Sequence, residues 1–229
     1  MRSFQLFKLL TVAGLRPRPS APWLALAMLV AIVPCQAGDR VHEGLLAVYD
    51  FRLAKGEMVK DRSGSGQPLD LKIENPKNIR RSEGRLEIRG QTLVRSVKPA
   101  SKISNAVKRS AAITLEAWVR SGNKKQEGPA RIVTISGNST NRNITLGQEE
   151  DRYDARFRTT ETSNNGLPSL ASKPGSLNLK LTHVVFTRNT AGHAKIYLNG
   201  KLNSSRSIGG RTARWDPTCL LYTSPSPRD

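Results

Sequence analysis

The chain has 229 residues and a formal net charge of +19, because 37 Lys and Arg residues face only 18 Asp and Glu residues. A basic surplus of this size favours association with polyanions but carries no information about the fold. No helix-turn-helix, zinc-finger or RNA-stacking signature accompanies the charge, so we exclude nucleic acid as the expected partner. An acidic polysaccharide or an anionic cell-surface polymer is the expected partner instead.

Residues 1–38 have the composition of an export signal. A basic, acid-free lead precedes an apolar run over residues 21–33 that is too short to span a bilayer comfortably. The small residues Cys35 and Ala37 precede the expected cleavage point after Ala37 or Gly38. We predict a helical signal peptide and a secreted, periplasmic or cell-surface protein with no stable membrane span after cleavage. An uncleaved membrane anchor is the alternative.

After a short linker at residues 39–43, residues 44–218 predict one all-β domain. Hydrophobic residues alternate with polar ones in short segments separated by Gly-, Ser- and Asn-rich turns. Strands are expected at residues 45–51, 69–73, 84–90, 112–121, 131–136, 143–148, 153–160, 181–188 and 194–200. Residues 101–110 form the one helix-like stretch, of a turn or two, and Asn199-Gly200 predicts a two-residue hairpin turn. The pattern is typical of an antiparallel β-sandwich of jelly-roll type.

The last eleven residues, 219–229, read CLLYTSPSPRD. Codon by codon, this segment resembles one frame of a transposase sequencing adapter. We therefore exclude it from the predicted domain and expect it to pack on nothing and to pair with no strand. On this interpretation the β-sandwich ends at Thr218 and is incomplete at its C-terminal side.

Five segments in order carry a resemblance to a known family: LLAVYDF, KDRSGSGQPLDLKI, AITLEAWVRSG, ITLGQEEDRYDARFRT and LTHVVFTRNTAGHAKIYLNGKLNSS. Together they resemble the successive strands of a laminin-G-like, concanavalin-A-type jelly roll of an exported bacterial protein. The resemblance covers residues 44–216 and implies a lectin-type or glucanase-type sandwich. It also implies a final strand that pairs near the first, for which this sequence has no counterpart.

Catalytic residues are sparse. Glycoside hydrolases of this architecture carry paired carboxylates, but Glu116 in ITLEAWV has no acidic neighbour. The acidic patch from Glu149 to Asp154 suits a solvated turn, and His183 suits a structural strand position. No zinc pattern or nucleophile elbow is present. We predict that the chain is not an enzyme.

The resemblance implies one cofactor, Ca²⁺, which related sandwiches hold with carboxylate and carbonyl oxygens. Asp61 in the DRSGSG loop is the first candidate ligand and Asp216 the second. A tight turn between strands is the alternative reading of Asp61. Among the aromatic residues, Trp118 is expected in the core, and Trp215 is the candidate platform for a sugar ring.

Basic residues concentrate near residues 80–109, where Arg85, Glu87 and Arg89 alternate with apolar residues and Arg95 follows. We predict a non-catalytic binding module for carbohydrate or an acidic polymer, with Arg85, Arg89, Arg95 and Trp215 as ligand-binding residues. The alternatives are a jelly-roll glycoside hydrolase or lyase with an incomplete catalytic strand, and a structural adhesion or spacer module. A second carboxylate facing Glu116 would favour the enzyme, and a flat face without a polar or aromatic groove would favour the spacer.

Overall fold

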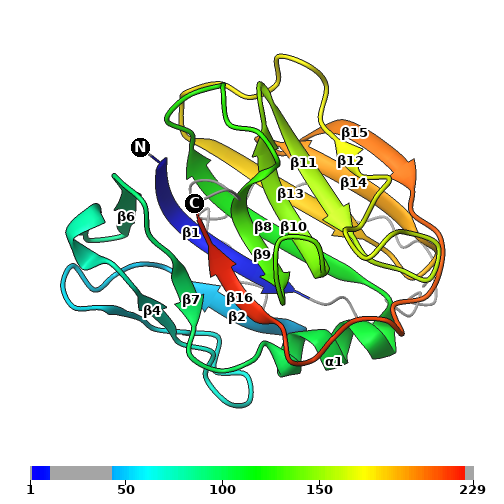
Figure 1. Cartoon of the computed structure of the whole chain (residues 1–229), viewed down its shortest axis with the longest axis horizontal. Coiled ribbons are helices and arrows are strands. Elements are labelled where there is room, and N and C mark those ends of the chain that lie inside the picture. The colour runs from blue at the N-terminus through cyan, green and yellow to red at the C-terminus, as the bar shows by residue number, and fades with distance from the viewer. Residues whose placement is uncertain (1, 11–42, 225–229) are drawn as a thin grey trace, which may run out of the picture.

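The computed structural model of the chain describes residues 2–10 and 43–224. Two antiparallel sheets of eight strands each pack face to face, and one α-helix closes an end of the sandwich (Figure 1). The predicted all-β sandwich is confirmed. No helix in the described part of the chain is long and apolar enough to cross a membrane.

Sheet A has the strand order β15-β14-β13-β8-β1-β6-β5, and β2 also pairs with β1. The bounds of its strands are β1 Arg2–Leu10, β2 Leu45–Tyr49, β5 Ile79–Ser82, β6 Arg85–Ile88, β8 Ile113–Arg120, β13 Thr182–Arg188, β14 His193–Leu198 and β15 Lys201–Ser207. A single turn of 3-10 helix, Pro76–Asn78, leads into β5.

Sheet B has the strand order β12-β11-β10-β9-β16-β7-β4-β3. Its strands are β3 Met58–Val59, β4 Leu71–Ile73, β7 Val94–Ser96, β9 Ala130–Ser136, β10 Arg142–Glu149, β11 Arg152–Phe157, β12 Leu170–Ala171 and β16 Leu220–Thr223.

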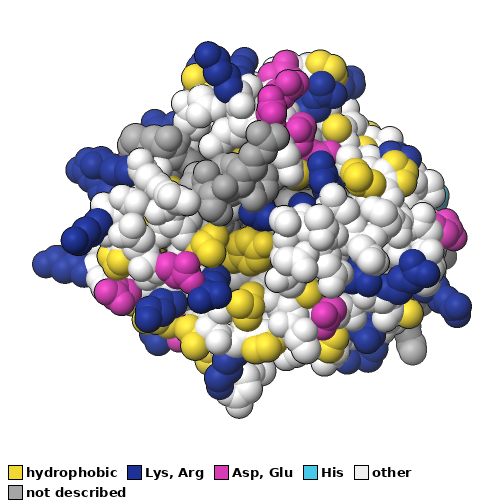
Figure 2. All heavy atoms as spheres, in the orientation of Figure 1, with side chains coloured by type: hydrophobic (Ala, Val, Ile, Leu, Met, Phe, Trp, Pro, Cys, Tyr) yellow, Lys and Arg dark blue, Asp and Glu magenta, His cyan; other side chains and the backbone are white. Residues whose placement is uncertain are grey.

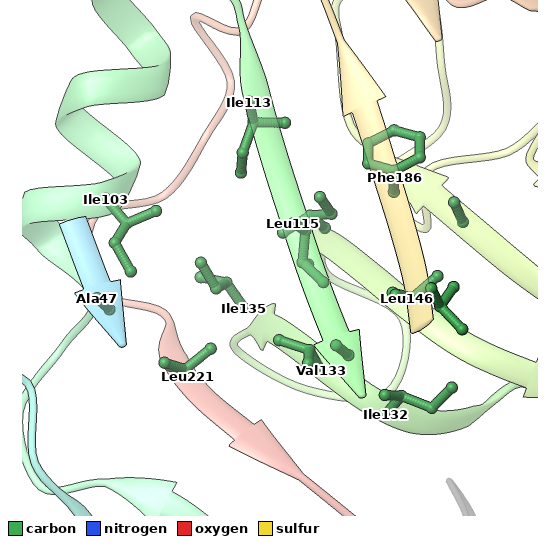
Figure 3. Packing of buried hydrophobic residues seen from close by; sticks show 14 of the residues in the cluster. Ala47, Ile103, Ile113, Leu115, Ile132, Val133, Ile135, Leu146, Phe186 and Leu221 are labelled. Atoms are coloured by element: carbon green, nitrogen blue, oxygen red, sulfur yellow. The ribbon is translucent and has the colours of Figure 1, made fainter. Parts of the chain in front are cut away.

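The core lies between the two sheets and follows from the period-two pattern of the long strands. In β8 the side chains of Leu115, Ala117 and Val119 are buried, while the alternate residues are partly exposed. Figure 3 shows Leu115 and Phe186 of sheet A near Ile135 and Leu146 of sheet B. Burial of this apolar surface is the main stabilising term of the fold.

Two local predictions are confirmed in position. The helix α1 spans Ser101–Ser110 and turns Ile103 and Val107 toward the core, so it is longer than the turn or two expected. The hairpin between β14 and β15 pairs Leu198 with Lys201. Its turn residues have positive φ angles, 50° at Asn199 and 79° at Gly200, which is the conformation that an Asn-Gly pair favours.

The first described residues differ from the expected leader helix. Residues 2–10 form the strand β1, which pairs with β8 on one side and with β2 and β6 on the other. This segment is rich in Phe and Leu and contains neither Gly nor Pro, so it is compatible with an interior strand. Most of the predicted signal peptide, including the apolar run and the cleavage point, lies outside the described residues.

The expectation that residues 219–229 would pack on nothing is wrong for residues 219–224. Strand β16 lies between β9 and β7 and pairs with both. Leu221 is fully buried and lies near Ala47 and Ile135 (Figure 3), and Cys219 is also in the core. The reason is that Leu220–Thr223 supplies apolar and aromatic residues to an interior position of sheet B. The adapter origin of the segment stays a prediction.

Candidate anion-binding face

A row of polar and basic side chains crosses the outer face of sheet B. Successive register pairs join Lys72 to Arg95, Arg95 to Tyr222, Tyr222 to Thr134, Thr134 to Thr145 and Thr145 to Arg156. Directly paired residues share one face of a sheet. The neighbours Leu71, Val94, Ile135 and Leu146 belong to the core, so this row lies on the opposite face of the sheet, where Lys72 and Arg95 are exposed and Thr134 and Thr145 are fully buried. We call these six residues the basic row; its members are Lys72, Arg95, Tyr222, Thr134, Thr145 and Arg156.

Two further arginines border the basic row. The guanidinium of Arg131 lies 5.3 Å from the centre of the Tyr222 ring, and its Nη1 donates to Ser224 Oγ at 3.3 Å. Arg142 donates from Nη1 to Thr145 Oγ1 at 3.3 Å and from Nη2 to the carbonyl of Ser139. We call Arg131, Arg142 and Arg156 the arginine cluster, since they come from the adjacent strands β9, β10 and β11.

Arg142 is a buried member of the cluster that keeps an unused donor. It is 2% exposed, its Nε–H has no hydrogen-bond partner, and the described residues include no salt bridge to it. Burial, followed by the nearby charges of Arg156 and Arg131, lowers the pKa of Arg142 to about 10. A buried polar group without a partner costs about 1–3 kcal/mol. This arrangement therefore favours a negative group beside Arg142.

Arg188 shows how a buried arginine is otherwise satisfied in this fold. It is also 2% exposed, but it donates to the backbone carbonyls of Ile208, Gly210 and Ala111. Its guanidinium also lies over the Phe157 ring, 5.1 Å from the ring centre. Arg188 is thus a structural arginine, whereas Arg142 retains unused donors.

Acidic groups offset part of the positive charge along the basic row. Arg95 Nε lies 2.5 Å from Glu74 Oε1, and Arg156 Nε donates to Asp154 Oδ2 at 3.0 Å. Asp154 is buried, so it is not the solvated turn residue expected. On the face seen in Figure 2, Lys and Arg side chains are more widespread than Asp and Glu. The face remains suited to an anionic ligand.

The predicted ligand-binding arginines do not form one site. Arg85 and Arg89 lie on and beside β6 in sheet A, and both contact the buried carboxylate of Glu87, at 2.5 and 3.3 Å. Arg95 lies on β7 in sheet B. Glu87 therefore offsets the positive charge of the Arg85 and Arg89 pair, and only Arg95 joins the basic row.

The prediction that Trp215 is an exposed platform for a sugar is wrong. Its side chain is 1% exposed and lies 5.2 Å from the Phe157 ring, measured between ring centres. The indole Nε1 donates to the carbonyl of Arg158 at 2.8 Å. A buried, hydrogen-bonded indole that packs beside the buried Phe157 ring is a core residue.

Replacing Trp215 by Phe tests this assignment. Trp215→Phe keeps an aromatic ring but removes the hydrogen bond to the Arg158 carbonyl, so we expect a loss of about 1–2 kcal/mol in the free energy of unfolding. Urea denaturation measures this loss. Retention of the folded variant on a polysaccharide matrix should equal that of the parent chain, and a selective loss of retention would restore the platform role.

Asp61 is the centre of a hydrogen-bond network. Oδ1 accepts from the backbone N–H groups of Val48 and Ser63, and Oδ2 accepts from the Leu69 N–H and from Lys102 Nζ at 2.7 Å. Burial alone would raise the pKa of the Asp61 carboxyl, but the hydrogen bonds from Lys102, Leu69 and Ser63 outweigh it, and the pKa is lowered. The ammonium of Lys102 supplies the positive charge that was predicted to come from calcium. Asp61 is thus not an open metal ligand in this structure.

Asp216, the second predicted ligand, stabilises a turn through hydrogen bonds to Thr218. Its Oδ1 accepts from the backbone N–H and the hydroxyl of Thr218, at 2.8 and 2.7 Å, and these bonds lower the pKa of the Asp216 carboxyl. No group of three or more His, Cys, Asp and Glu side chains suited to a metal gathers in residues 2–10 and 43–224. The two predicted ligands do not form a shared site, and calcium binding stays a prediction.

Glu116 and His183 meet on the outer face of sheet A. His183 Nε2 lies 3.2 Å from Glu116 Oε1, and the His183 ring stacks on Trp118 with 4.6 Å between ring centres. Trp118 is half-buried on this outer face, so its expected place in the core is wrong. The residues in register with Glu116 are Val185 and Lys8, and neither is acidic. The paired carboxylates expected of a jelly-roll glycosidase are not formed by these strands.

The two packed antiparallel sheets define a β-sandwich domain, and sequence comparison gives its family. The profile of Laminin_G_3, described as the concanavalin A-like lectin/glucanases superfamily, matches residues 96–226. The chain therefore belongs to this superfamily, as the resemblance implied. No curated protein matches the chain significantly.

Solved structures support the same fold. One match is a structure of botulinum neurotoxin type C, a toxin whose cell entry is described as dependent upon interaction with two ganglioside molecules. The match has 15% sequence identity and a TM-score of 0.50, and it covers 77% of this chain. The serotype D/C VPI 5993 binding domain matches with 16% identity, a TM-score of 0.50 and 76% coverage. The matched part is 42% of each of those chains. At this identity the likeness shows the fold alone.

Proposed function

We propose that this domain is a non-catalytic binding module of an exported protein and that it binds an acidic polysaccharide through the outer face of sheet B. The observation that carries the proposal is the basic row with its bordering arginines, which places cations on adjacent strands of one face. Repeated cations match the repeated anions of a polymer. At physiological ionic strength salt screens charges that are more than about 8 Å apart, so binding requires several cations in close contact with several anions at once.

Two further observations support a binding role. The similar neurotoxin structures include a domain described as a binding domain, and one is described as interacting with ganglioside molecules. On the other sheet, Glu116 contacts His183 rather than a second carboxylate. Export and the polysaccharide partner rest on the leader sequence and the charge, and both are part of the proposal. Because residues 2–10 form β1, the proposal requires that the leader is not cleaved.

Retention on polymer matrices tests the proposal. We expect the full chain to bind sulfated and carboxylated polysaccharide, to elute as salt rises, and to pass through a neutral matrix. The charge-reversal variant Lys72→Glu/Arg95→Glu should bind at least about tenfold more weakly, because two exposed attractions become repulsions. The matched control is Lys195→Glu/Lys201→Glu on sheet A, which reverses two exposed lysines of β14 and β15 and should retain the affinity of the parent chain.

Two results would contradict the proposal. Equal retention on the neutral matrix would favour ring stacking over charge, and the stacked pair Trp118 and His183 would then be the first residues to test. A larger loss in the sheet A control than in the sheet B variant would move the site to sheet A.

A further inference from the structure

The arginine cluster has the properties of a discrete subsite within the larger basic face. We propose that Arg142, together with Arg131 and Arg156, binds one tetrahedral oxyanion group of the ligand, a sulfate or phosphate ester. The inference rests on the proposed function, because it names the group that the acidic polymer presents to sheet B.

Arg142 has more donors than the fold uses. A guanidinium carries five N–H donors, whereas the structure gives Arg142 hydrogen bonds to Thr145 Oγ1 and to the Ser139 carbonyl. The Nε–H is buried and has no partner. In the comparable environment of Arg188, backbone carbonyls accept from both Nε and the Nη atoms. Arg142 is therefore prepared for an external acceptor in a way that Arg188 is not.

The surroundings favour a negative charge at this place. Arg131 is 5% exposed and Arg156 has a side-chain exposure of 15%, so the three cations lie in a region of low solvent access. Asp154 accepts from Arg156 and not from Arg142, and Glu149 lies 3.8 Å from Arg156. Electrostatic attraction is stronger where water is excluded, so an anion here gains more than it would beside an exposed arginine.

The arrangement of the cluster selects the class of anion. The hydroxyls of Thr134 and Thr145, 2.6 Å apart, bond to each other and to the Ile144 carbonyl, so the available donors are the three guanidinium groups, which come from three adjacent strands. A sulfate or phosphate ester offers three terminal oxygens to such donors, whereas a carboxylate offers two. Arginine is the residue that binds these groups with paired hydrogen bonds.

An anion reaches Arg142 by displacing an existing acceptor. The residues 137–141, between β9 and β10, are mostly exposed and contact Arg142 through the Ser139 carbonyl. An exposed loop moves at lower cost than the strands beside it. The bound oxyanion would replace the Ser139 carbonyl and also satisfy the free Nε–H.

Calorimetric titration with inorganic sulfate and phosphate at constant ionic strength tests the subsite on the full chain. We expect saturable binding of one anion, reduced at least about tenfold in Arg142→Met, as expected for the loss of charge-assisted hydrogen bonds. Arg85→Met on sheet A is the matched control and should bind like the parent chain. Circular dichroism and a cooperative melt establish that each variant is folded.

A second variant and a second anion complete the test of the subsite. If Arg142→Met does not fold, Arg156→Met should bind sulfate severalfold more weakly, and an unchanged affinity would overturn the subsite. If acetate binds as tightly as sulfate, the inference that the subsite prefers a tetrahedral oxyanion is wrong. No saturable binding of either inorganic anion would overturn the inference, while retention that still depends on Lys72 and Arg95 would leave the proposed function standing.

Discussion

A chain reduced to residues 39–218 is expected not to fold into a cooperative domain. This truncation removes β1 from between β8 and β6 in sheet A, and β16 from between β9 and β7 in sheet B. Each sheet then contains strands with unpaired N–H and C=O groups in its interior, beside uncovered apolar residues such as Leu115 and Ile135. Such edges promote aggregation.

Thermal denaturation followed by circular dichroism, with a dye that reports exposed apolar surface, measures this effect. The matched control is a chain that ends at Ser224, which removes none of the described residues and should melt like the full chain. A sharp, reversible melt of residues 39–218 in the usual range of about 45–65 °C would contradict the account. Cleavage of the predicted leader would also remove β1, so residues 2–10 cannot serve both as a cleaved leader and as a strand of sheet A.

Replacement of Asp61 by Ala is expected to cost about 3–5 kcal/mol of the free energy of unfolding. The change leaves Lys102 without its carboxylate and removes the acceptor for the N–H groups of Val48, Ser63 and Leu69. The Asp61 side chain is fully buried, and water cannot readily replace these bonds. Glu74→Ala is the control, because Glu74 forms an exposed pair with Arg95 and should cost under about 1 kcal/mol.

The lowered pKa of Asp61 also implies that the stability of the fold depends on pH. Because the pKa of Asp61 is lowered in the folded state, its contribution to stability is present above the unfolded pKa of about 4 and is lost as the pH falls through the folded pKa. Urea denaturation of the parent chain should show this acid loss, and Asp61→Asn should reduce it. Two results would show that Asp61 does not stabilise the fold through this network. One is an equal loss of stability at acid pH in the parent chain and in Asp61→Asn, and the other is a cost for Asp61→Ala no larger than that of Glu74→Ala.

Much of the fold could be predicted because the long strands keep a strict alternation. In β8 and β13 fully buried residues alternate with partly exposed ones, and the pattern extends over eight and seven residues. The strands β3 and β12 have two residues each, too few for any alternation to be recognised. Strands β1 and β16 were missed because composition assigned their segments to a leader and to a non-native tail.

The candidate site could be predicted only in part, because its residues are joined by sheet order and not by proximity in the chain. Arg95 was identified, but Lys72 and Arg156 become its neighbours only through the adjacency of β4, β7, β16, β9, β10 and β11. Nothing in the sequence around Arg142, the first residue of β10, indicated that its side chain is buried. Trp215 was taken for a surface residue because it follows the last recognised hairpin, yet its segment returns to the core beside Phe157.

We propose that the ligand lies on the outer face of sheet B. Covalent labelling of lysines with and without a soluble sulfated polysaccharide tests it directly, because Lys72 on sheet B and Lys195 on sheet A are both exposed. We expect the ligand to protect Lys72 and to leave the labelling of Lys195 unchanged. Protection of Lys195 with full labelling of Lys72 would contradict it.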